Sequence, residues 1–206
     1  RVGAAKCGPD YIDPMFHSRI IGAKSANLDL HFFSENTLRF LLAKNAAGCD
    51  VSVIEGAMGF YDGAGLTTWK TSAYELALVT KTPVVLVVNA RGAALSVLAA
   101  VQGFLQFQPH SGIRGVILNG CTAMSYAPLA EELEARFGIK ACGYLPRLPA
   151  CTLESRHLGL VTAAEVADLR EKLQRLAAQA EMSIDLDLLL RLANEAPPLA
   201  VCPPPL

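Results

Sequence analysis

Short apolar segments rich in β-branched residues recur along this chain, and they leave few folds open. Two are apolar on both faces and two more are weaker: 51–55 and 83–89, then 114–119 and 140–145. A strand that is apolar on both faces lies in a sheet covered on both sides, which means parallel strands joined by helical crossovers. The segments between them carry apolar residues at helical spacing and supply these helices: 35–47, 72–80, 93–107 and 126–137. The sequence therefore predicts an α/β fold with a doubly wound, mostly parallel sheet.

Composition and charge exclude several classes of protein. Hydrophobic residues make up 52% of the 206 residues, so the chain has ample apolar surface to fold and disorder is excluded. The net charge of −1 argues against a nucleic-acid partner, which normally requires a basic surface. The most apolar stretch, 83–105, is interrupted by polar residues, so we expect no membrane partner. The six cysteines form no CxxC pair and no secretory signal opens the chain, which favours a cytoplasmic protein.

Both ends of the chain predict flanking sequence. The chain does not begin with Met, and its first residues already have the pattern of a strand, so we expect the true N-terminus upstream. The segment 196–206 is proline-rich and has the composition of a linker, which predicts a domain over 1–195 and the start of a linker over 196–206. The sequence contains no G-x-x-x-x-G-K-[ST] phosphate-binding loop. Either the protein binds no nucleotide, or that loop lies in sequence outside this chain.

Carboxylates follow the strands, where ligands bind in open parallel sheets. Glu55 closes a strand and precedes a glycine-rich loop. Its carboxylate is suited to hold Mg²⁺, while the glycines let the backbone approach phosphate. Asp10, Asp13 and Asp62 add three carboxylates that suit a second metal contact or a polar substrate. The alternative for Asp10 and Asp13 is that they initiate turns beside the neighbouring prolines.

Other polar residues near strand ends are weaker candidates. Lys6 leaves the first strand and is suited to neutralise phosphate, or it is a solvated lysine. Asn119 ends a strand and is suited to read a nucleobase edge, or it forms a turn. Arg156 and His157 lie in a predicted loop where they are suited to meet an anionic substrate. We expect His17 to be a surface or hydrogen-bonded residue rather than a catalytic one.

Three segments together resemble the cobyrinic acid a,c-diamide synthase family. They are KCGPDYIDPMFH over 6–17, NLD over 27–29 and VIEGAMGFYDG over 53–63. Further matching segments keep the same order, and the resemblance runs from about 2 to 165: 83–92, 115–119, 143–147 and 154–161. The GPDYIDP and EGxMGxYDG pieces are highly specific together, whereas GVILN alone is weak.

The resemblance implies a P-loop NTPase-like synthetase domain, similar to dethiobiotin synthetase, with the first strand and phosphate loop absent from this chain. It implies ATP-dependent, glutamine-dependent amidation of the a and c side-chain carboxylates of cobyrinic or hydrogenobyrinic acid through a carboxyl phosphate. ATP and Mg²⁺ are the implied cofactors. The implied partners are the corrin-ring carboxylate and ammonia from a glutaminase domain outside this chain. We leave a homodimer open and expect the chain alone to be inactive.

The resemblance also implies roles for individual residues. Glu55 matches the Mg²⁺ ligand, Lys6 the phosphate-side lysine, and Asn119 a position that faces adenine in related synthetases. Three aspartates match catalytic positions at the metal and substrate edge: Asp10, Asp13 and Asp62. The remaining matches are on the substrate side: Asn27, Asp29, Tyr61, Arg156 and His157.

Three other interpretations stay open. A nickel-sirohydrochlorin a,c-diamide synthase or another tetrapyrrole amidotransferase, such as cobyric acid synthase, has the same fold and reaction. A partition-type ATPase switch explains the α/β pattern, but it predicts a basic DNA-contacting patch or an amphipathic membrane tail, whereas 196–206 is uncharged. The third interpretation is that the chain is a non-catalytic remnant of a synthetase, and the missing phosphate-binding loop favours this interpretation.

Overall fold

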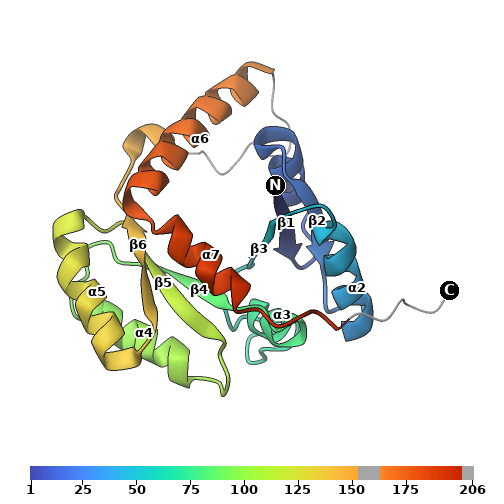
Figure 1. Ribbon diagram of the computed structural model, residues 1–206, viewed down its shortest axis with the longest axis horizontal. Helices are drawn as coiled ribbons and strands as arrows, with labels where there is room; N and C mark the ends of the chain where they lie inside the picture. The colour runs from blue at the N-terminus through green and yellow to red at the C-terminus, as the bar shows by residue number, and fades with distance from the viewer. Residues whose placement is uncertain (153–162, 201–206) are drawn as a thin grey trace. The chain divides into compact units, whose positions relative to one another are not determined.

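The computed structural model describes residues 1–152 and 163–200, without the side chains of 163–167, and they form two compact units (Figure 1). The first unit takes 1–82, 163–170 and 197–200 of these residues, and the second takes 83–152 and 171–196. One long helix, α6 (Ala163–Ser183), contributes to both units. Each unit contains a three-stranded parallel sheet, so the predicted α/β class with parallel strands is confirmed.

The first unit is a sheet of order β2-β1-β3. Its strands are β1 (Val2–Cys7), β2 (Lys24–Leu28) and β3 (Val51–Glu55). A short helix α1 (Ile12–Phe16) continues into the π-helical turn η1 (His17–Ile21) between β1 and β2. The other helices are α2 (Glu35–Ala46), capped by the Ser34 hydroxyl, and α3 (Ala73–Thr80), capped by the Ser72 hydroxyl.

Alternation along β1 separates the core of this unit from its polar face. Ala5 and Cys7 are buried in a cluster with leucines from β2, α2 and α3. Lys6 lies between them in sequence and therefore points to the opposite face, where it meets residues of α1 and β3. One strand thus supplies both the hydrophobic core and a cationic side chain.

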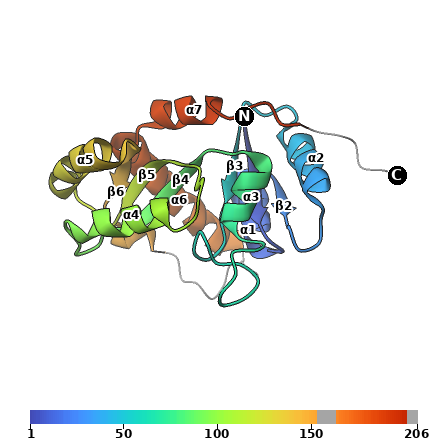
Figure 2. The same cartoon turned by 90° about the horizontal axis from the view of Figure 1, so that it is seen from below.

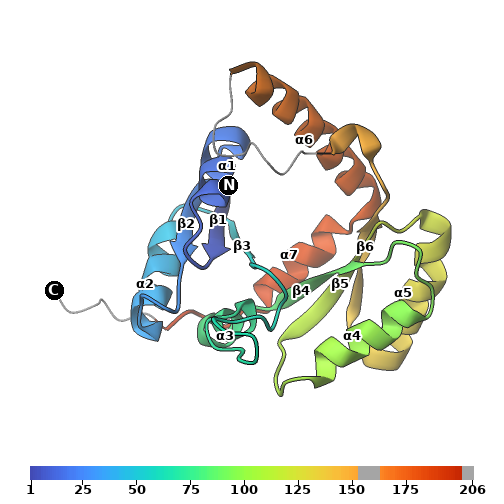
Figure 3. The same ribbon diagram turned by 180° about the vertical axis from the view of Figure 1, so that it is seen from behind.

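The second unit is a sheet of order β4-β5-β6. Its strands are β4 (Val84–Asn89), β5 (Ile113–Asn119) and β6 (Lys140–Leu145). Helices α4 (Ser96–Gln106) and α7 (Leu186–Asn194) lie on opposite faces of this sheet (Figures 2 and 3). The remaining elements are α5 (Ala123–Phe137) and the 3-10 turn η2 (Pro149–Cys151).

The sequence predicted most of these elements, with two differences. The strands at 51–55, 83–89, 114–119 and 140–145 and the four intervening helices are confirmed, whereas β2 and the α1–η1 segment were not foreseen. The prediction that both faces of the sheet are covered is wrong in part, because Val53 is 57% exposed and Val87 is 60% exposed. Both valines lie on strands at the edge of their own three-stranded sheet. Among the helices described, none is long and apolar enough to cross a membrane.

Candidate functional site

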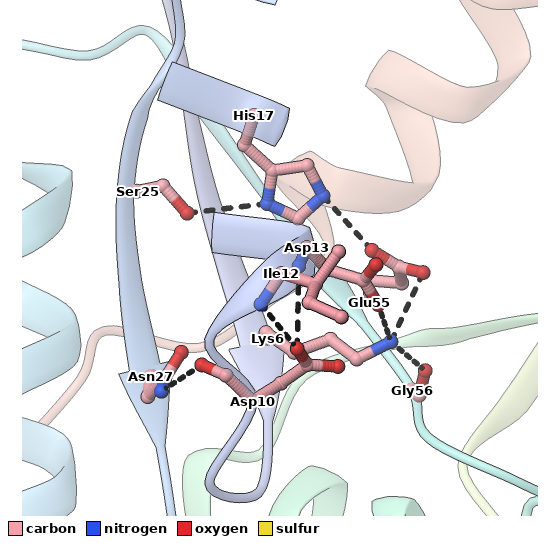
Figure 4. Close-up of polar contacts among 9 residues, drawn as sticks. All are labelled: Lys6, Asp10, Ile12, Asp13, His17, Ser25, Asn27, Glu55 and Gly56. Carbon is pink, nitrogen blue, oxygen red and sulfur yellow. Dashed lines mark hydrogen bonds and ion pairs between the residues drawn. The ribbon is translucent and has the colours of Figure 1, made fainter. Parts of the chain in front are cut away.

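Three polar residues form one row across the first sheet at the carboxyl ends of its strands. In the parallel register, Lys6 of β1 pairs with Asn27 of β2 on one side and with Glu55 of β3 on the other. Paired residues in a parallel sheet point to the same face, so these three side chains lie together (Figure 4). The loop between β1 and α1 and the α1–η1 segment lie over this row.

Lys6 is the centre of the cluster. Its Nζ lies 2.6 Å from Asp13 Oδ2 and 3.1 Å from Glu55 Oε1, and it donates to the Gly56 carbonyl at 3.2 Å. The side chain is only 7% exposed, and burial by itself lowers the pKa of its ammonium. Hydrogen bonds and charge attraction from Asp13 and Glu55 outweigh that effect, so the pKa of Lys6 is raised. All three ammonium hydrogens have acceptors, so a phosphate contact would replace one of these bonds.

Asp13 pairs with Lys6, whereas Asp10 accepts hydrogen bonds from the backbone. The hydrogen bond from Lys6 lowers the pKa of the Asp13 carboxyl, which therefore stays ionised at neutral pH. Asp10 Oδ1 instead accepts the backbone N–H groups of Ile12 at 2.8 Å and Asp13 at 3.2 Å. Asp10 thus folds the first turn of α1, as the turn alternative predicted, and this turn presents Asp13 to Lys6.

Glu55 is held from two sides and is still open to solvent. Its Oε1 pairs with Lys6, its Oε2 lies 2.9 Å from His17 Nε2, and its side chain is 47% exposed. His17 is therefore part of the cluster, although the sequence predicted only a surface or hydrogen-bonded histidine. The signal that points to it is its spacing of four residues from Asp13, which places both on one face of the helical segment 12–21.

Two buried oxygen atoms on the β2 side have no donor among the described residues. They are Asn27 Oδ1 and Asp29 Oδ2. Asn27 donates from Nδ2 to the Asp10 carbonyl, and Asp29 Oδ1 accepts from His31 N at 2.7 Å. Asp29 is only 4% exposed. A buried acceptor without a donor costs about 1–3 kcal/mol, so these two atoms are suited to a ligand that carries hydrogen-bond donors.

The loop between β3 and α3 is built around aromatic rings. Tyr74 contacts Phe60, Tyr61 and Trp69, with ring centroids 5.1–5.9 Å apart. Burial, with a smaller contribution from Tyr74, raises the pKa of Tyr61 to about 12, so Tyr61 stays neutral at physiological pH. The exposed Asp62 accepts the Gly59 N–H at 2.9 Å and closes a tight turn in the same loop.

The other predicted site residues lie elsewhere. Asn119 is the exposed last residue of β5 in the second unit, paired in register with Asn89 of β4. Its carbonyl accepts the Ala90 N–H at 2.8 Å, so its backbone helps to shape the turn after β4. Arg156 and His157 fall outside the residues that the structure describes.

Glu55 fits a Mg²⁺ ion of the kind that is shared with phosphate and water. Mg²⁺ is usually bound through one or two carboxylates and keeps several waters, rather than being enclosed by protein ligands. The described part of the chain contains no group of three or more His, Cys, Asp or Glu side chains placed to hold a metal. A half-exposed carboxylate with unused lone pairs therefore matches a shared site, and an all-protein cage does not.

The first unit places a buried cation and several carboxylates at the carboxyl ends of parallel strands. Open-sheet α/β proteins bind their ligands at this position. The chain belongs to the AAA domain family, which it matches over residues 20–155. That match covers β2 to β6 and excludes the strand that carries Lys6.

Curated relatives confirm the resemblance that the motifs indicated. The chain is 41% identical over 193 residues to a cobyrinate a,c-diamide synthase of Caldanaerobacter subterraneus subsp. tengcongensis, covering 93% of this chain and 42% of the relative. It is 38% identical to the Listeria monocytogenes serotype 4b protein of the same name, covering 99% and 46%. It is also 38% identical to a hydrogenobyrinate a,c-diamide synthase of Mesorhizobium japonicum, covering 97% and 46%. The chain thus spans less than half the length of these relatives.

The Lys6 cluster predicts a pH-dependent contribution to stability. Lys6→Met leaves two carboxylates without their cation and should cost about 2 kcal/mol, or about 4–8 °C in the thermal midpoint. Asp13 has a lowered pKa, so its contribution is present above its usual value of 3.8 and is lost as the pH falls through its folded value. Lys6 has a raised pKa, so its contribution is present below 10.5 and is lost at higher pH.

Thermal unfolding followed by circular dichroism from neutral to acid pH checks this window. The difference in thermal midpoint between wild type and Lys6→Met should be largest near neutral pH and should shrink below pH 3.8. The exposed Lys44 of α2 provides the matched control, and Lys44→Met should shift the midpoint little at any pH. A gap that does not change between neutral and acid pH would show that the ion pairs are not its source.

The β3–α3 loop predicts unequal tolerance at two nearby glycines. A Cβ on Gly63 would overlap the carbonyl oxygens of Thr68 and Lys70, whereas one on Gly65 would lie 3.4 Å from the Thr68 methyl group. Trp69, the single tryptophan, packs on Tyr74 and under Lys70 and therefore reports on this loop. Gly63→Ala should shift tryptophan emission to the red and lower the thermal midpoint by several degrees, whereas Gly65→Ala should change neither. Equal spectra for the two variants would contradict this account of the loop.

Proposed function

We propose that the protein containing this chain catalyses ATP-dependent, glutamine-dependent amidation of the a and c carboxylates of cobyrinate or hydrogenobyrinate. The observation that carries the proposal is the Lys6–Asp13–Glu55 cluster, because it gathers charged groups within the motifs that most resemble these enzymes. The names of the relatives support the substrate class. The whole reaction also requires a source of ammonia, which we assign to a glutaminase domain outside this chain.

The proposed chemistry has two steps. A substrate carboxylate oxygen attacks the γ-phosphorus of ATP, which forms a carboxyl phosphate and releases ADP. Ammonia then attacks the acyl carbon, phosphate leaves, and the amide remains. Both steps crowd negative charge around the transferred phosphoryl group, so cationic groups are the main catalytic requirement.

The residues of the cluster suit that requirement. Mg²⁺, when bound, would supply charge neutralisation at the phosphates, and Glu55 is the residue suited to hold it. The ammonium of Lys6 lies 3.1 Å from Glu55 Oε1, so it supplies a second positive charge beside the same carboxylate. Asp13 keeps that ammonium in place, and Asp10 shapes the turn that carries Asp13.

The remaining assignments are proposals that rest on position. We assign Asp29 and Asn27 to the substrate side because their unpartnered buried oxygens suit hydrogen-bond donors. Tyr61 and Asp62 belong to the β3–α3 loop, and we place the corrin ring and its reacting carboxylate on that side. Asn119 is assigned to adenine, and Arg156 and His157 to the substrate. We further propose that 1–195 is the synthetase domain and that 196–206 begins a linker, and we leave a homodimer open.

The carboxylate of Glu55 should be essential for amidation in the full-length protein. Glu55→Gln keeps the shape of the side chain but removes the charge that faces Lys6 and would hold Mg²⁺. Amidation should fall at least about 100-fold, while hydrolysis of glutamine stays within about twofold of wild type. Product formation by chromatography and glutamate release measure the two activities separately.

Two further variants sharpen this test. Glu35→Gln removes an exposed carboxylate from α2 and should leave both activities unchanged. Asp62→Asn should also reduce amidation strongly, because the loop that it closes belongs to the proposed substrate side. Wild-type amidation in Glu55→Gln would overturn the site assignment, and wild-type amidation in Asp62→Asn would remove the loop from it.

A further inference from the structure

We propose that His17, braced by Ser25, is a positioning residue that fixes the orientation of the Glu55 carboxylate for its ligand. The proposal rests on the function proposed above, in which Glu55 holds Mg²⁺ beside phosphate. His17 itself acts through Glu55 and not on the reacting atoms. Ser25 acts in turn through His17.

The imidazole of His17 joins two strands of the first sheet. Nε2 lies 2.9 Å from Glu55 Oε2 on β3, and Nδ1 lies 3.1 Å from Ser25 Oγ on β2. The ring therefore crosses over β1, and Figure 4 shows it between the two partners. Its side chain is 12% exposed, whereas that of Glu55 is 47% exposed. The more buried imidazole of His17 thus anchors the more exposed carboxylate of Glu55.

The chemistry of the partners assigns the hydrogens on the ring. An ionised carboxylate only accepts hydrogen bonds, so Nε2 carries the hydrogen that points to Glu55. In the neutral ring Nδ1 is then an acceptor, and the Ser25 hydroxyl donates to it. The carboxylate thus sets the ring form, and the hydroxyl holds the ring in the orientation that donates to Glu55, in the same way that outer partners orient the ligands of metal sites.

Glu55 needs such support because of its place in the fold. It ends β3 before Gly56 and a glycine-rich loop, and its side chain is 47% exposed, so its rotamer depends on the partners of its two oxygens. Lys6 holds Oε1 and His17 holds Oε2, so each oxygen has one defined partner. The second lone pair of each oxygen stays free for a ligand from the solvent side.

The backbone around His17 is also specialised. His17 begins the π-helical turn η1, and its carbonyl accepts N–H groups from Gly22 and Ala23. Gly22 has a positive φ of 78°, which ends the turn and leads the chain into β2. Widened helical turns of this kind recur at functional sites, where they redirect a side chain. The turn brings His17 and Ser25 within hydrogen-bond distance although they are eight residues apart.

The test is a double-mutant cycle in the full-length protein. The variants are His17→Ala, Ser25→Ala, the double variant, and His17→Gln, which offers an amide N–H near the position of Nε2. Ser18→Ala is the matched control, because among the described residues this exposed hydroxyl on η1 donates only to backbone carbonyls of its own helical segment. The measurements are the calorimetric Kd for ATP with Mg²⁺, the Mg²⁺ concentration at half-maximal rate, and kcat at saturating Mg²⁺.

The expected pattern separates positioning from a general loss of structure. His17→Ala should raise the Kd and the half-maximal Mg²⁺ concentration about 10-fold, with little change in kcat at saturation. Ser25→Ala should raise both about threefold, and the double variant should match His17→Ala, because Ser25 acts only through His17. His17→Gln should recover part of the loss, and Ser18→Ala should match wild type.

Two results would overturn the proposal. One is an unchanged Kd and half-maximal Mg²⁺ concentration in His17→Ala. The other is a double variant whose effect is the product of the two single effects, which would mean that Ser25 and His17 act independently. In either case the activity of Glu55→Gln decides whether the proposed function fails together with the role of His17. A defective Glu55→Gln variant leaves the proposed function in place, whereas a normal one removes Glu55 from the site.

Discussion

The buried ammonium of Lys6 holds the candidate site together. A lysine that is 7% exposed is stable only if acceptors surround its charge, and here Asp13, Glu55 and the Gly56 carbonyl do so. These acceptors come from α1 and from the end of β3 and the residue after it, so one side chain ties two distant segments of the chain together. Removal of Lys6 would leave two neighbouring carboxylates that repel each other. The same charge that stabilises the fold locally is the one that suits an anionic ligand.

The position of Lys6 follows from the alternation of β1. Ala5 and Cys7 are buried in the core with Leu28 and the leucines of α2 and α3. The residue between them must face the other side of the sheet, and the parallel register then aligns it with Asn27 and Glu55. Hydrophobic packing on one face therefore fixes the register of the polar row on the other. A shift of one residue in the pairing of β1 would exchange its two faces, which would disrupt both the hydrophobic core and the polar row.

The sequence predicted the parts of this structure that depend on local pattern. The strand at 83–89 was recognised because both of its faces are hydrophobic, and the weaker apolar run at 114–119 was recognised beside it. The strand β2 was not, because its KSANL sequence carries the polar residues that face the site, and only pairing with β1 makes it a strand. The clustering of Lys6 and Glu55 at one edge was predictable from strand ends. The contact between His17 and Glu55 was not predicted, because the spacing of His17 from Asp13 becomes a signal only once the helical segment 12–21 is known.

We propose that Lys6 and its carboxylates form the site where a corrin carboxylate is phosphorylated before amidation. Transfer of ¹⁸O from the labelled carboxylates of cobyrinate to released phosphate, in full-length wild type and Lys6→Met, tests it most directly. A carboxyl phosphate must pass one carboxylate oxygen to phosphate for each amide formed, so wild type should release one ¹⁸O per amide. Lys6→Met should transfer the label about 100-fold more slowly. Unlabelled phosphate from the wild type would show that no carboxyl phosphate forms, and equal rates in the two proteins would show that Lys6 is not part of the site.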